Sequence, residues 1–472
     1  MKKDSGVGRW LDKVSGGAQQ AFARSLDRHL VLAVTGLSGA GKSAFITSLL
    51  FQLINFRDAR LPFFKPCAEQ RLLAVRRIPQ QRLDWVRYPY EDSLTALSSE
   101  PPCWPEPTKG VSTVSLELAY RPTKQPLATL TNRALMQLDI VDYPGEWLLD
   151  LPLLELDYRQ WCELFATMLP NRPEVPALTD WKLSIDTIDL DAPADEFHIA
   201  EVAQQYAELL QAWRCQGAYL LQPGRFVLPG EYENTPLLHF FPLMTVSQDT
   251  AKFNRGSVGE MLEKRFEQYK SKVVKRFYKD YFSRFDRQIV LVDPLTALGA
   301  GHNQLLEMQQ ALLQVLGSFR YGRSSIIRRL FSPKIEKVML AATKADHVTP
   351  EQHEPLKGLI RQLLLTEQNP WAFSDIAFDC ITLASIRASN SGKSQLTGGL
   401  KPMLKGVRLS DREEIITFPG EVPASVPSSQ FFNDHQFSFV PFAPPVIGKS
   451  DNQVPHIAMD RVLQFLLGDK LQ

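Results

Sequence analysis

A glycine-rich segment at residues 36–43, with the sequence GLSGAGKS, contains the residue types that bind a chain of phosphates. Gly36 and Gly41 let the backbone curl so that successive amide groups point inward, and the N-terminus of the following helix adds a partial positive charge. Lys42 can reach the β- and γ-phosphates of a nucleoside triphosphate, and the Ser43 hydroxyl can bind Mg2+. We therefore predict that a nucleotide binds to this loop through Ser38, Gly39, Ala40, Gly41, Lys42, Ser43 and Ala44.

A second motif, DYPG, begins at Asp142 and directly follows an apolar run. The Asp142 carboxylate, at the C-terminal end of a strand, could hold Mg2+ through water, and the Gly145 amide could donate to the γ-phosphate. The threonine that senses Mg2+ should lie in the loop before the strand expected at residues 112–120. Thr108 is our candidate for this metal ligand, and Thr113 is the alternative, although we expect Thr113 to lie inside the strand.

A third motif, TKAD at residues 343–346, follows another apolar run and could recognise the base. The Asp346 carboxylate can accept two hydrogen bonds, from N1 and N2 of guanine, whereas adenine offers no such pair of donors. Lys344 would lie against the plane of the base. After the last apolar run, Ser385 and Ile386 could present a backbone amide to guanine O6. We therefore predict that guanine is bound by Thr343, Lys344, Asp346, Ser385 and Ile386.

Short apolar runs are the strands that must position these motifs, and we expect them at residues 29–35, 112–120, 134–142, 288–293, 337–343 and 376–384. Several runs are apolar on both faces, as in a parallel sheet that is covered by helices on each side. The helix that leaves the phosphate loop is expected at residues 43–56. The predicted class is therefore α/β, with a doubly wound, mostly parallel sheet.

Long stretches without strand patterns divide the chain. Residues 146–287 show helical periodicity, and residues 57–107 are rich in proline and arginine. We expect a loop at residues 389–399; its SGKS tetrapeptide resembles the end of a phosphate loop, but Arg387 stands where the first glycine should be. The predicted division is an N-terminal helical arm at 1–28, a nucleotide-binding domain in two parts at 29–145 and 288–390 with an insertion at 57–107, an inserted helical subdomain at 146–287, and a β-rich extension at 391–472 that ends in a helix.

Composition argues against several classes of partner. The 472 residues carry a net charge of +1, so no global field attracts nucleic acid, and we expect no nucleic-acid partner. No apolar run approaches the roughly 20 residues of a membrane helix, and we recognise no signal peptide. Five scattered cysteines without a CxxC pair favour a reduced, cytoplasmic protein. The basic, aromatic stretch at 264–287 fits a solvated helix with its aromatic side chains buried. The alternative is a surface for acidic lipid or nucleic acid, and a peripheral contact with the inner membrane or a membrane protein stays open.

The motifs, taken in order, resemble the G motifs of Ras-like P-loop GTPases. The wider sequence resembles the YcjX-like family of bacterial P-loop stress proteins, through GLSGAGKSAF at 36–45, DYPGEWLLDLPLL at 142–154 and AATKADHV at 341–348. The resemblance implies a Ras-like P-loop NTPase fold, GTP or GDP as the ligand, Mg2+ as the cofactor and a role in the bacterial stress response. It also implies catalytic roles for Lys42, Thr108, Gly145 and Glu146.

Departures from the Ras-like pattern lower the expected rate of hydrolysis. Glu146 stands where a glutamine often orients the attacking water, and its charge is unfavourable near a γ-phosphate. No arginine lies in the few residues before Thr108, and Thr343 replaces the usual asparagine of the base motif. We therefore predict a switch with slow GTP hydrolysis that signals through the helical insertion, and that needs an effector or activating protein not yet identified. The alternatives are an ATP-driven NTPase or kinase, and a nucleotide-stabilised scaffold without meaningful turnover.

Overall fold

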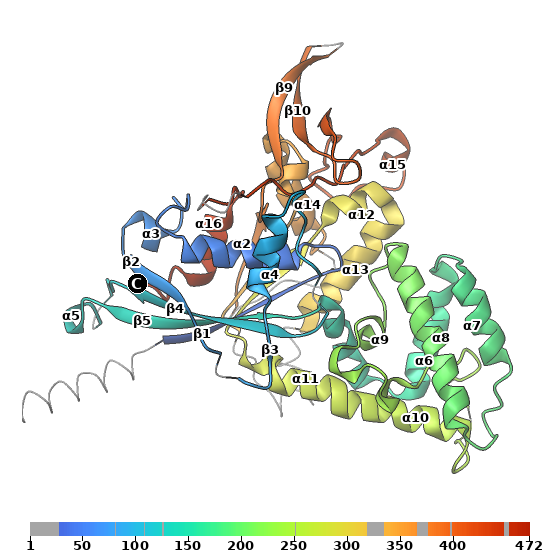
Figure 1. Cartoon of the computed structure of the whole chain (residues 1–472). Coiled ribbons are helices and arrows are strands. Elements are labelled where there is room, and N and C mark those ends of the chain that lie inside the picture. Colours follow the sequence, from blue (N-terminus) through green and yellow to red (C-terminus); the bar gives the residue numbers. More distant parts are fainter. Residues whose placement is uncertain are drawn as a thin grey trace, which may run out of the picture.

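A mixed β-sheet forms the centre of the protein in the computed structural model. The structure describes residues 28–80, 82–107, 109–124, 127–250, 252–318, 335–365, 376–396, 399–447 and 453–472. The eight-stranded sheet has the order β2-β4-β5-β1-β6-β7-β8, and β3 pairs with β4 (Figure 1). Strands β5, β1, β6, β7 and β8 are parallel, whereas β4 is antiparallel to β5 and to β2. The strands are β1 Arg28–Gly36, β2 Leu72–Ile78, β3 Val86–Arg87, β4 Ser112–Tyr120, β5 Ala134–Asp142, β6 Arg287–Val292, β7 Lys337–Ala342 and β8 Ala377–Thr382. The predicted α/β class with a mostly parallel sheet is confirmed.

Hydrophobic side chains cover the two faces of the sheet. Side chains alternate between the faces along a strand, so Leu32 and Val34 of β1 pack in one buried cluster and Ala33 packs in the other. The first cluster includes helices α2 (Lys42–Ile54) and α16 (Met459–Leu467), and the second includes α13 (His302–Ser318). The remaining helices around the sheet are α3 Lys65–Ala68, α4 Tyr90–Leu97, α5 Leu127–Leu130, α12 Pro294–Ala300, η8 Ala345–His347, η9 Pro350–Gln352 and α14 His353–Gln362.

A buried arginine attaches the C-terminal helix to the sheet. Arg287, the first residue of β6, is fully buried, and its guanidinium donates to Asp469 at 2.5 Å and to Glu336 at 3.2 Å. Asp469 also contacts Lys337 at the start of β7, at 3.0 Å. Residues almost two hundred positions apart therefore share one ion-pair network, which no local pattern in the sequence indicates.

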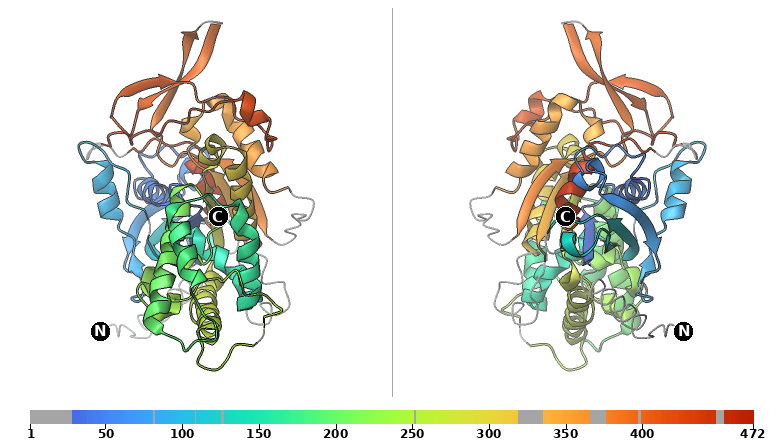
Figure 2. Two further views of the ribbon diagram at one scale, coloured as in Figure 1. Left: turned by 90° about the vertical axis from the view of Figure 1, so that its right-hand side faces the viewer. Right: turned by 90° about the vertical axis from the view of Figure 1, so that its left-hand side faces the viewer.

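The helical insertion follows β5 and precedes β6 in the sequence, and it lies to one side of the sheet (Figures 1 and 2). It begins with a 3-10 helix, η1 (Gly145–Glu155), and an aromatic core holds it together; Trp161 stacks on Phe266 with ring centroids 5.1 Å apart. Asp195 caps helix α8 by accepting from the amides of residues 197 and 198. The other helices are α6 Tyr158–Met168, η2 Leu169–Asn171, α7 Pro176–Asp186, α8 Glu196–Cys215, α9 Gly224–Val227, η3 Gly230–Tyr232, η4 Pro236–Leu238, α10 Val258–Tyr269, η5 Lys270–Val274 (a π-helix), α11 Lys275–Asp280 and η6 Phe282–Arg284.

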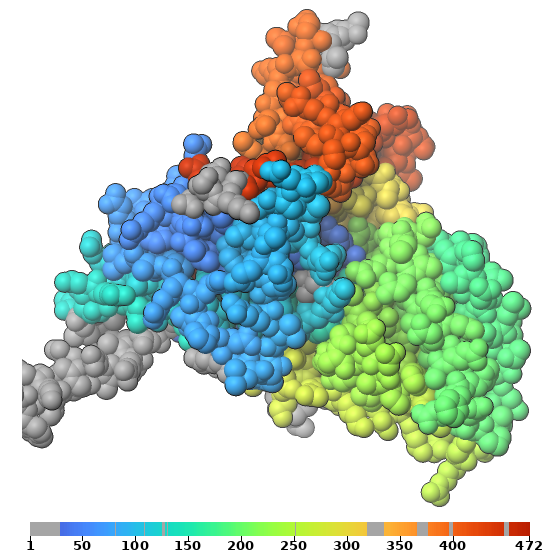
Figure 3. Space-filling model, viewed as in Figure 1, coloured from blue at the N-terminus to red at the C-terminus, as the bar shows by residue number. Residues whose placement is uncertain are grey.

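Space filling shows the insertion, in green, as a lobe packed against the sheet domain (Figure 3). Its basic stretch forms α10, η5 and α11, and the aromatic side chains of Phe266, Tyr269 and Phe277 are buried. The expectation of a helical segment with buried aromatic side chains is therefore met. Within the described ranges, no helix is long and apolar enough to cross a membrane.

A small antiparallel sheet follows the main one, and its hairpin projects from the molecule (Figures 1 and 2). It contains β9 (Ser389–Leu396), β10 (Gly399–Val407) and β11 (Glu414–Thr417), and a short helix, α15 (Phe431–Asp434), follows. The expected loop at 389–399 is therefore wrong, because β9 pairs with β10 over eight residue pairs. Backbone pairing in an exposed hairpin needs no apolar face, so its polar composition concealed the strand.

Strand β2 is a second element that the sequence analysis missed, inside the stretch at 57–107. It lies at the edge of the main sheet and is antiparallel to β4. Only part of this strand is buried, and it carries Arg76 and Arg77 in place of a continuous apolar run. The N-terminal arm predicted at 1–28 lies outside the described residues, apart from the backbone of Arg28 at the start of β1.

Candidate nucleotide-binding site

The glycine-rich loop joins the central strand β1 to helix α2, as its sequence predicts. Gly41 has a φ of 77°, in the left-handed region that favours glycine, and it is the residue directly before the helix. The backbone of Lys42 and of the residues after it belongs to the first turn of α2, whose amides have no partner inside the helix. Lys42 makes no hydrogen bond or ion pair with any described residue. This loop therefore combines a helix N-terminus with a cation that has no partner among the described residues, and the two together favour a bound anion.

A cavity of about 660 Å3 lies over the loop and brings the separate motifs together. It is lined by the loop residues 38–44, by Glu146, and by the ends of the segments that follow β7 and β8. In a parallel sheet such a crevice forms outside the carboxyl ends of the strands. The predicted residues on its wall are Ser38, Gly39, Ala40, Gly41, Lys42, Ser43, Ala44, Glu146, Thr343, Lys344, Asp346, Ser385 and Ile386.

Asp346 lies at one end of this cavity and is almost fully buried. Its Oδ2 accepts from the Ala388 amide at 2.8 Å, and its Oδ1 lies 3.3 Å from Nδ1 of His347. Burial opposes ionisation, but the charge and hydrogen bond of His347 and the Ala388 amide hold the pKa of this carboxyl below its ordinary value. A carboxylate has about four acceptor positions, so these contacts do not use all of them, and Asp346 can still accept from a ligand.

Neighbouring residues hold the same end of the cavity in place. Lys344 adopts a φ of 59°, an unusual value for a residue with a side chain, and its ammonium pairs with Asp293 at 2.5 Å. Such strained residues cluster at functional sites. The carbonyl of Ser385 accepts from the Ser48 hydroxyl at 2.5 Å, which ties this segment to helix α2.

The DYPG segment lies beneath the loop, with its tyrosine fully buried between β1 and β6. The Tyr143 hydroxyl contacts Gln288 Oε1 at 3.1 Å, and the Thr35 hydroxyl donates to the Tyr143 carbonyl at 3.1 Å. Gly145 lies so close to the Gly36 carbonyl that a β-carbon at this position would overlap it. This segment is therefore packed directly against the strand that carries the phosphate loop.

Asp142 and Ser43, the predicted Mg2+ ligands, both interact with Tyr88 beside the loop. Asp142 ends β5 and is 2% exposed. The Tyr88 hydroxyl donates to the Ser43 carbonyl at 2.8 Å; burial raises the pKa of Tyr88 to about 12, and the charge of Asp142 contributes to that rise. Mg2+ is usually bound by one or two protein oxygens together with phosphate oxygens and water. The buried Asp142 carboxylate and the Ser43 hydroxyl fit such a sparse ligand set.

The two threonine candidates differ in their position. Thr113 lies inside β4, and its hydroxyl donates to the Ile140 carbonyl at 3.1 Å, so it belongs to the sheet. This agrees with the expectation that it lies within the strand. Thr108 lies outside the described residues, so its role as a metal ligand stays a prediction.

Several residues that line the cavity carry no local motif, and sequence reasoning missed them. Arg214 reaches the phosphate loop from helix α8, and the Trp104 indole donates to the Phe442 carbonyl at 2.9 Å across the cavity wall. Apart from His347 and Ala384, which adjoin predicted residues, these residues come from the helical insertion, the stretch at 57–107 and the C-terminal extension, which only folding brings together. The full set is Trp104, Pro105, Pro107, Gln211, Arg214, Cys215, Leu228, His347, Ala384, Leu409, Pro441 and Phe442.

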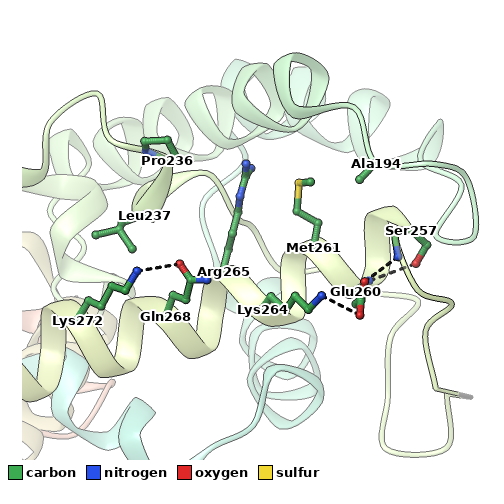
Figure 4. Close-up of a pocket in the computed structure, with 11 residues that line it drawn as sticks. Ala194, Pro236, Leu237, Ser257, Glu260, Met261, Lys264, Arg265, Gln268 and Lys272 are labelled. Carbon is green, nitrogen blue, oxygen red and sulfur yellow. Dashed lines mark hydrogen bonds and ion pairs between the residues drawn. The ribbon is translucent and has the colours of Figure 1, made fainter.

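A second hollow lies in the helical insertion and is lined by basic residues (Figure 4). Arg265 pairs with Glu196 at 2.8 Å, and Lys264 pairs with Glu260 at 2.9 Å. Lys272 donates to the side-chain oxygen of a glutamine one turn earlier, at 3.4 Å. Because these cations already have protein partners, this hollow offers less to a phosphate than the loop at 36–43.

The 3-10 helix η1 connects the cavity to the insertion. Glu146, its second residue, lines the cavity, and the next residue, Trp147, donates its indole N–H to the Leu228 carbonyl at 2.9 Å. The guanidinium of Arg225 lies 3.1 Å from the centre of the Trp147 ring. Gly224 packs so closely on the backbone of Glu146 that a β-carbon would overlap it. A movement of Glu146 would therefore be transmitted directly to the insertion.

Asp150, in the same 3-10 helix, makes the stability of the protein depend on pH. It is fully buried, and it accepts from the Gly224 amide at 2.7 Å and contacts the Tyr269 hydroxyl at 2.5 Å. Burial raises the pKa of this carboxyl to about 6. The unfolded chain has the ordinary value near 4, so the folded state binds the proton more tightly.

The tighter proton binding of the folded state stabilises the protein. We expect this stabilisation to be complete below about pH 4 and to be lost as pH rises through about 6; it amounts to roughly 2–3 kcal/mol in the free energy of unfolding. Asp150→Asn should remove it, so the stability of the variant relative to wild type should rise between pH 4 and pH 7. Urea unfolding at several pH values measures this difference, with the exposed Asp180→Asn as the control. A relative stability that does not change with pH would contradict the prediction.

Known proteins are similar to this chain over nearly its whole length. The model of the "YcjX-like family, DUF463" matches residues 30–471. A protein named "Ras-like GTPase YcjX" from Escherichia coli (strain K12) is 44% identical over 454 residues, which cover 95% of this chain and 97% of that protein. A protein of the same name from Shewanella oneidensis is 40% identical over 479 residues, which cover 98% of this chain and 99% of that protein.

Proposed function

We propose that this chain, which belongs to the YcjX-like family, binds GTP with Mg2+ and hydrolyses it slowly as a molecular switch. The observation that carries the proposal is that the phosphate loop and Asp346 line the same cavity, which has a volume of about 660 Å3. The names of the two relatives, both Ras-like GTPases, support the same reading. Guanine is favoured because a carboxylate at this position accepts from N1 and N2 of that base.

Hydrolysis would proceed by in-line attack of water on the γ-phosphate. Lys42 and the loop amides would stabilise the negative charge that develops, because the loop and the first turn of α2 hold them in place before the reaction. Ser43 and Asp142 would hold Mg2+, together with Thr108, and the bound ion would neutralise charge on the β- and γ-phosphates. Gly145 would donate its amide to the γ-phosphate.

Glu146 is the reason to expect a slow reaction. It is 6% exposed, and its Oε2 has no hydrogen-bond partner among the described residues. This oxygen could hold a water molecule near the γ-phosphate, but a carboxylate there repels the charge of the phosphates. We expect single-turnover hydrolysis below about 0.1 s−1. A purified protein that hydrolyses GTP at tens of turnovers per second would contradict this expectation.

A competition assay tests the ligand. Fluorescent GDP bound to the purified protein should be displaced by GTP and GDP, and not by ATP at the same concentration. Displacement by ATP alone would favour an ATP-driven enzyme. Equal affinity for GDP and GTP, with no phosphate released over hours, would favour a nucleotide-stabilised scaffold.

The switch would signal through the helical insertion, because η1 starts at Gly145 and packs on α9 (Gly224–Val227). When the γ-phosphate leaves, Gly145 would lose its contact, and the adjoining segment could rearrange. We expect lower amide exchange across residues 147–158 with a non-hydrolysable GTP analogue than with GDP. Hydrogen-exchange mass spectrometry measures this, with β9 as an internal control, and identical protection in the two states would rule out this route.

The cellular setting is part of the same proposal and rests on the family resemblance. We place the switch in the cytoplasm, in a bacterial stress response, with an effector or activating protein, or a peripheral membrane partner, that responds to its nucleotide state. Affinity capture with the GTP-locked and GDP-bound forms should recover different partners. Identical partners in both states would argue against a switch.

A further inference from the structure

The phosphate end of the cavity contains an arginine that comes from the helical insertion. Arg214 is the second-to-last residue of α8 (Glu196–Cys215), and 27% of its side chain is exposed. Its Nε donates to the Ser38 hydroxyl of the phosphate loop at 3.2 Å. Its Nη2 lies 3.5 Å from Glu146 Oε1. The guanidinium therefore bridges the phosphate loop and the segment that follows Gly145.

We propose that Arg214 is the arginine that stabilises the charge of the γ-phosphate during GTP hydrolysis, supplied by the chain itself. This inference rests on the proposed function, because it assigns a role at the same site. Ser38 and Glu146 mark the end of the cavity where the γ-phosphate would lie, whereas Asp346 and Ser385 mark the end for the base. Arg214 contacts the first pair.

The other cations of the cavity wall have different positions. Lys344 is held by Asp293 at 2.5 Å at the base end, and Lys42 belongs to the phosphate loop itself. His347 contacts Asp346, also at the base end. Arg214 is therefore the arginine that the cavity wall presents to the phosphates. A guanidinium is always charged, and its planar fork of donors matches two oxygens of a phosphoryl group.

Glu146 holds this arginine loosely. The contact of 3.5 Å is long for a charge-assisted hydrogen bond, which typically measures about 2.7–2.9 Å. A phosphate group carries more negative charge than a carboxylate and presents three oxygens. With GTP in the cavity, Arg214 would donate to the γ-phosphate, and Glu146 would become free to accept from the attacking water.

In the reaction, the water oxygen forms a bond to the γ-phosphorus while the bond from this phosphorus to the β–γ bridging oxygen breaks. GDP leaves with the electron pair of the bridging oxygen, and the water proton leaves on inorganic phosphate or to solvent. Arg214 neither gives nor takes a proton. It stabilises the charge on the bridging and γ-phosphate oxygens, which is the role that arginines play in other phosphoryl transfers.

The position of Arg214 in the insertion also makes hydrolysis sensitive to anything that moves this lobe. Gln211, one turn earlier in α8, donates to the Val227 carbonyl at 2.6 Å, in the α9 segment that packs on Glu146. A partner that binds the insertion could therefore bring Arg214 closer to the γ-phosphate or withdraw it.

The test compares Arg214→Ala and Arg214→Lys with Arg276→Ala in the full-length protein. Arg276 lies in the same insertion and pairs with Asp280 at 3.3 Å, but it is exposed and away from the cavity. We expect Arg214→Ala to lower single-turnover GTP hydrolysis by about 30-fold, the ratio between enzymes with and without an arginine of their own. Arg214→Lys should recover little of this loss, because an ammonium lacks the planar fork. Arg276→Ala should leave the rate unchanged.

Binding measurements separate a role in the reaction from a role in folding. GDP affinity of Arg214→Ala should stay within about threefold of wild type, because the contact forms with the γ-phosphate. GDP with aluminium fluoride, which imitates the transferring phosphoryl group, should bind wild type but not Arg214→Ala. If Arg214→Ala does not bind GDP, Arg214→Lys becomes the test variant. Hydrolysis by Arg214→Lys at a rate near that of wild type would overturn the proposal.

Two failures can be distinguished. If wild type neither binds nor hydrolyses GTP, the proposed function is wrong, and this inference falls with it. If wild type hydrolyses GTP and Arg214→Ala does so at the same rate with normal GTP affinity, only the role of Arg214 is wrong.

Discussion

Asp346→Asn should convert the protein from guanine to xanthine nucleotides. The substitution would remove two charge-assisted hydrogen bonds that guanine N1 and N2 donate to the carboxylate. Each is worth about 1.5–3 kcal/mol, so GTP affinity should fall by roughly 10²- to 10⁴-fold. Xanthine carries an oxygen where guanine carries the N2 amino group. An asparagine can accept from N1 of xanthine and donate to this oxygen, so xanthosine triphosphate should bind more tightly to the variant than to wild type.

Fluorescence titration with labelled guanine and xanthine nucleotides measures this exchange of specificity. Asp346 also accepts from the Ala388 amide at 2.8 Å, so thermal unfolding should be recorded to separate a local effect from loss of structure. Asp379→Asn is the matched control, because Asp379 lies on β8 and pairs with Arg361 at 3.6 Å, outside the cavity. Unchanged GTP affinity in Asp346→Asn would refute the assignment of guanine.

Lys42→Ala should lower the affinity for GTP and GDP by about 100-fold or more. Lys42 lines the cavity and is half-buried, and its ammonium has no partner among the described residues, so its charge is available to the ligand. A hydrogen bond to a charged group contributes about 1.5–3 kcal/mol, and one cation here faces two phosphates. The loss should be larger for GTP than for GDP, because Lys42 would reach the γ-phosphate only in GTP.

The chain provides a matched control for this variant. Lys393 belongs to a second SGKS tetrapeptide, but that segment forms part of strand β9, where Lys393 pairs with Pro402 of β10. Lys393→Ala should therefore leave nucleotide binding unchanged in calorimetric titrations. Equal effects of the two substitutions would indicate that general positive charge, and not the loop, determines affinity.

Elements with a strong local signal could be predicted from the sequence. The ranges 112–120 and 134–142 coincide with β4 and β5, because apolar residues recur at every second position in each, the pattern of a strand with one face in the core. Strand β2 and the hairpin of β9 and β10 could not be predicted in this way. They lie at a sheet edge or in an exposed hairpin, where backbone pairing tolerates polar side chains.

By itself, the sequence determined which motifs could do chemistry, and from them it predicted a phosphate loop around Lys42 and a carboxylate at Asp346 that suits guanine. These residues lie in short motifs at strand ends, and a parallel sheet brings its carboxyl ends to one edge. Only the tertiary structure decided what else surrounds the ligand. Arg214 is more than 170 positions from Ser38 in the sequence, yet the two side chains are hydrogen-bonded. Such a contact depends on how the helices of the insertion pack on η1, through Trp147 and Gly224, and no local pattern around Arg214 encodes that packing.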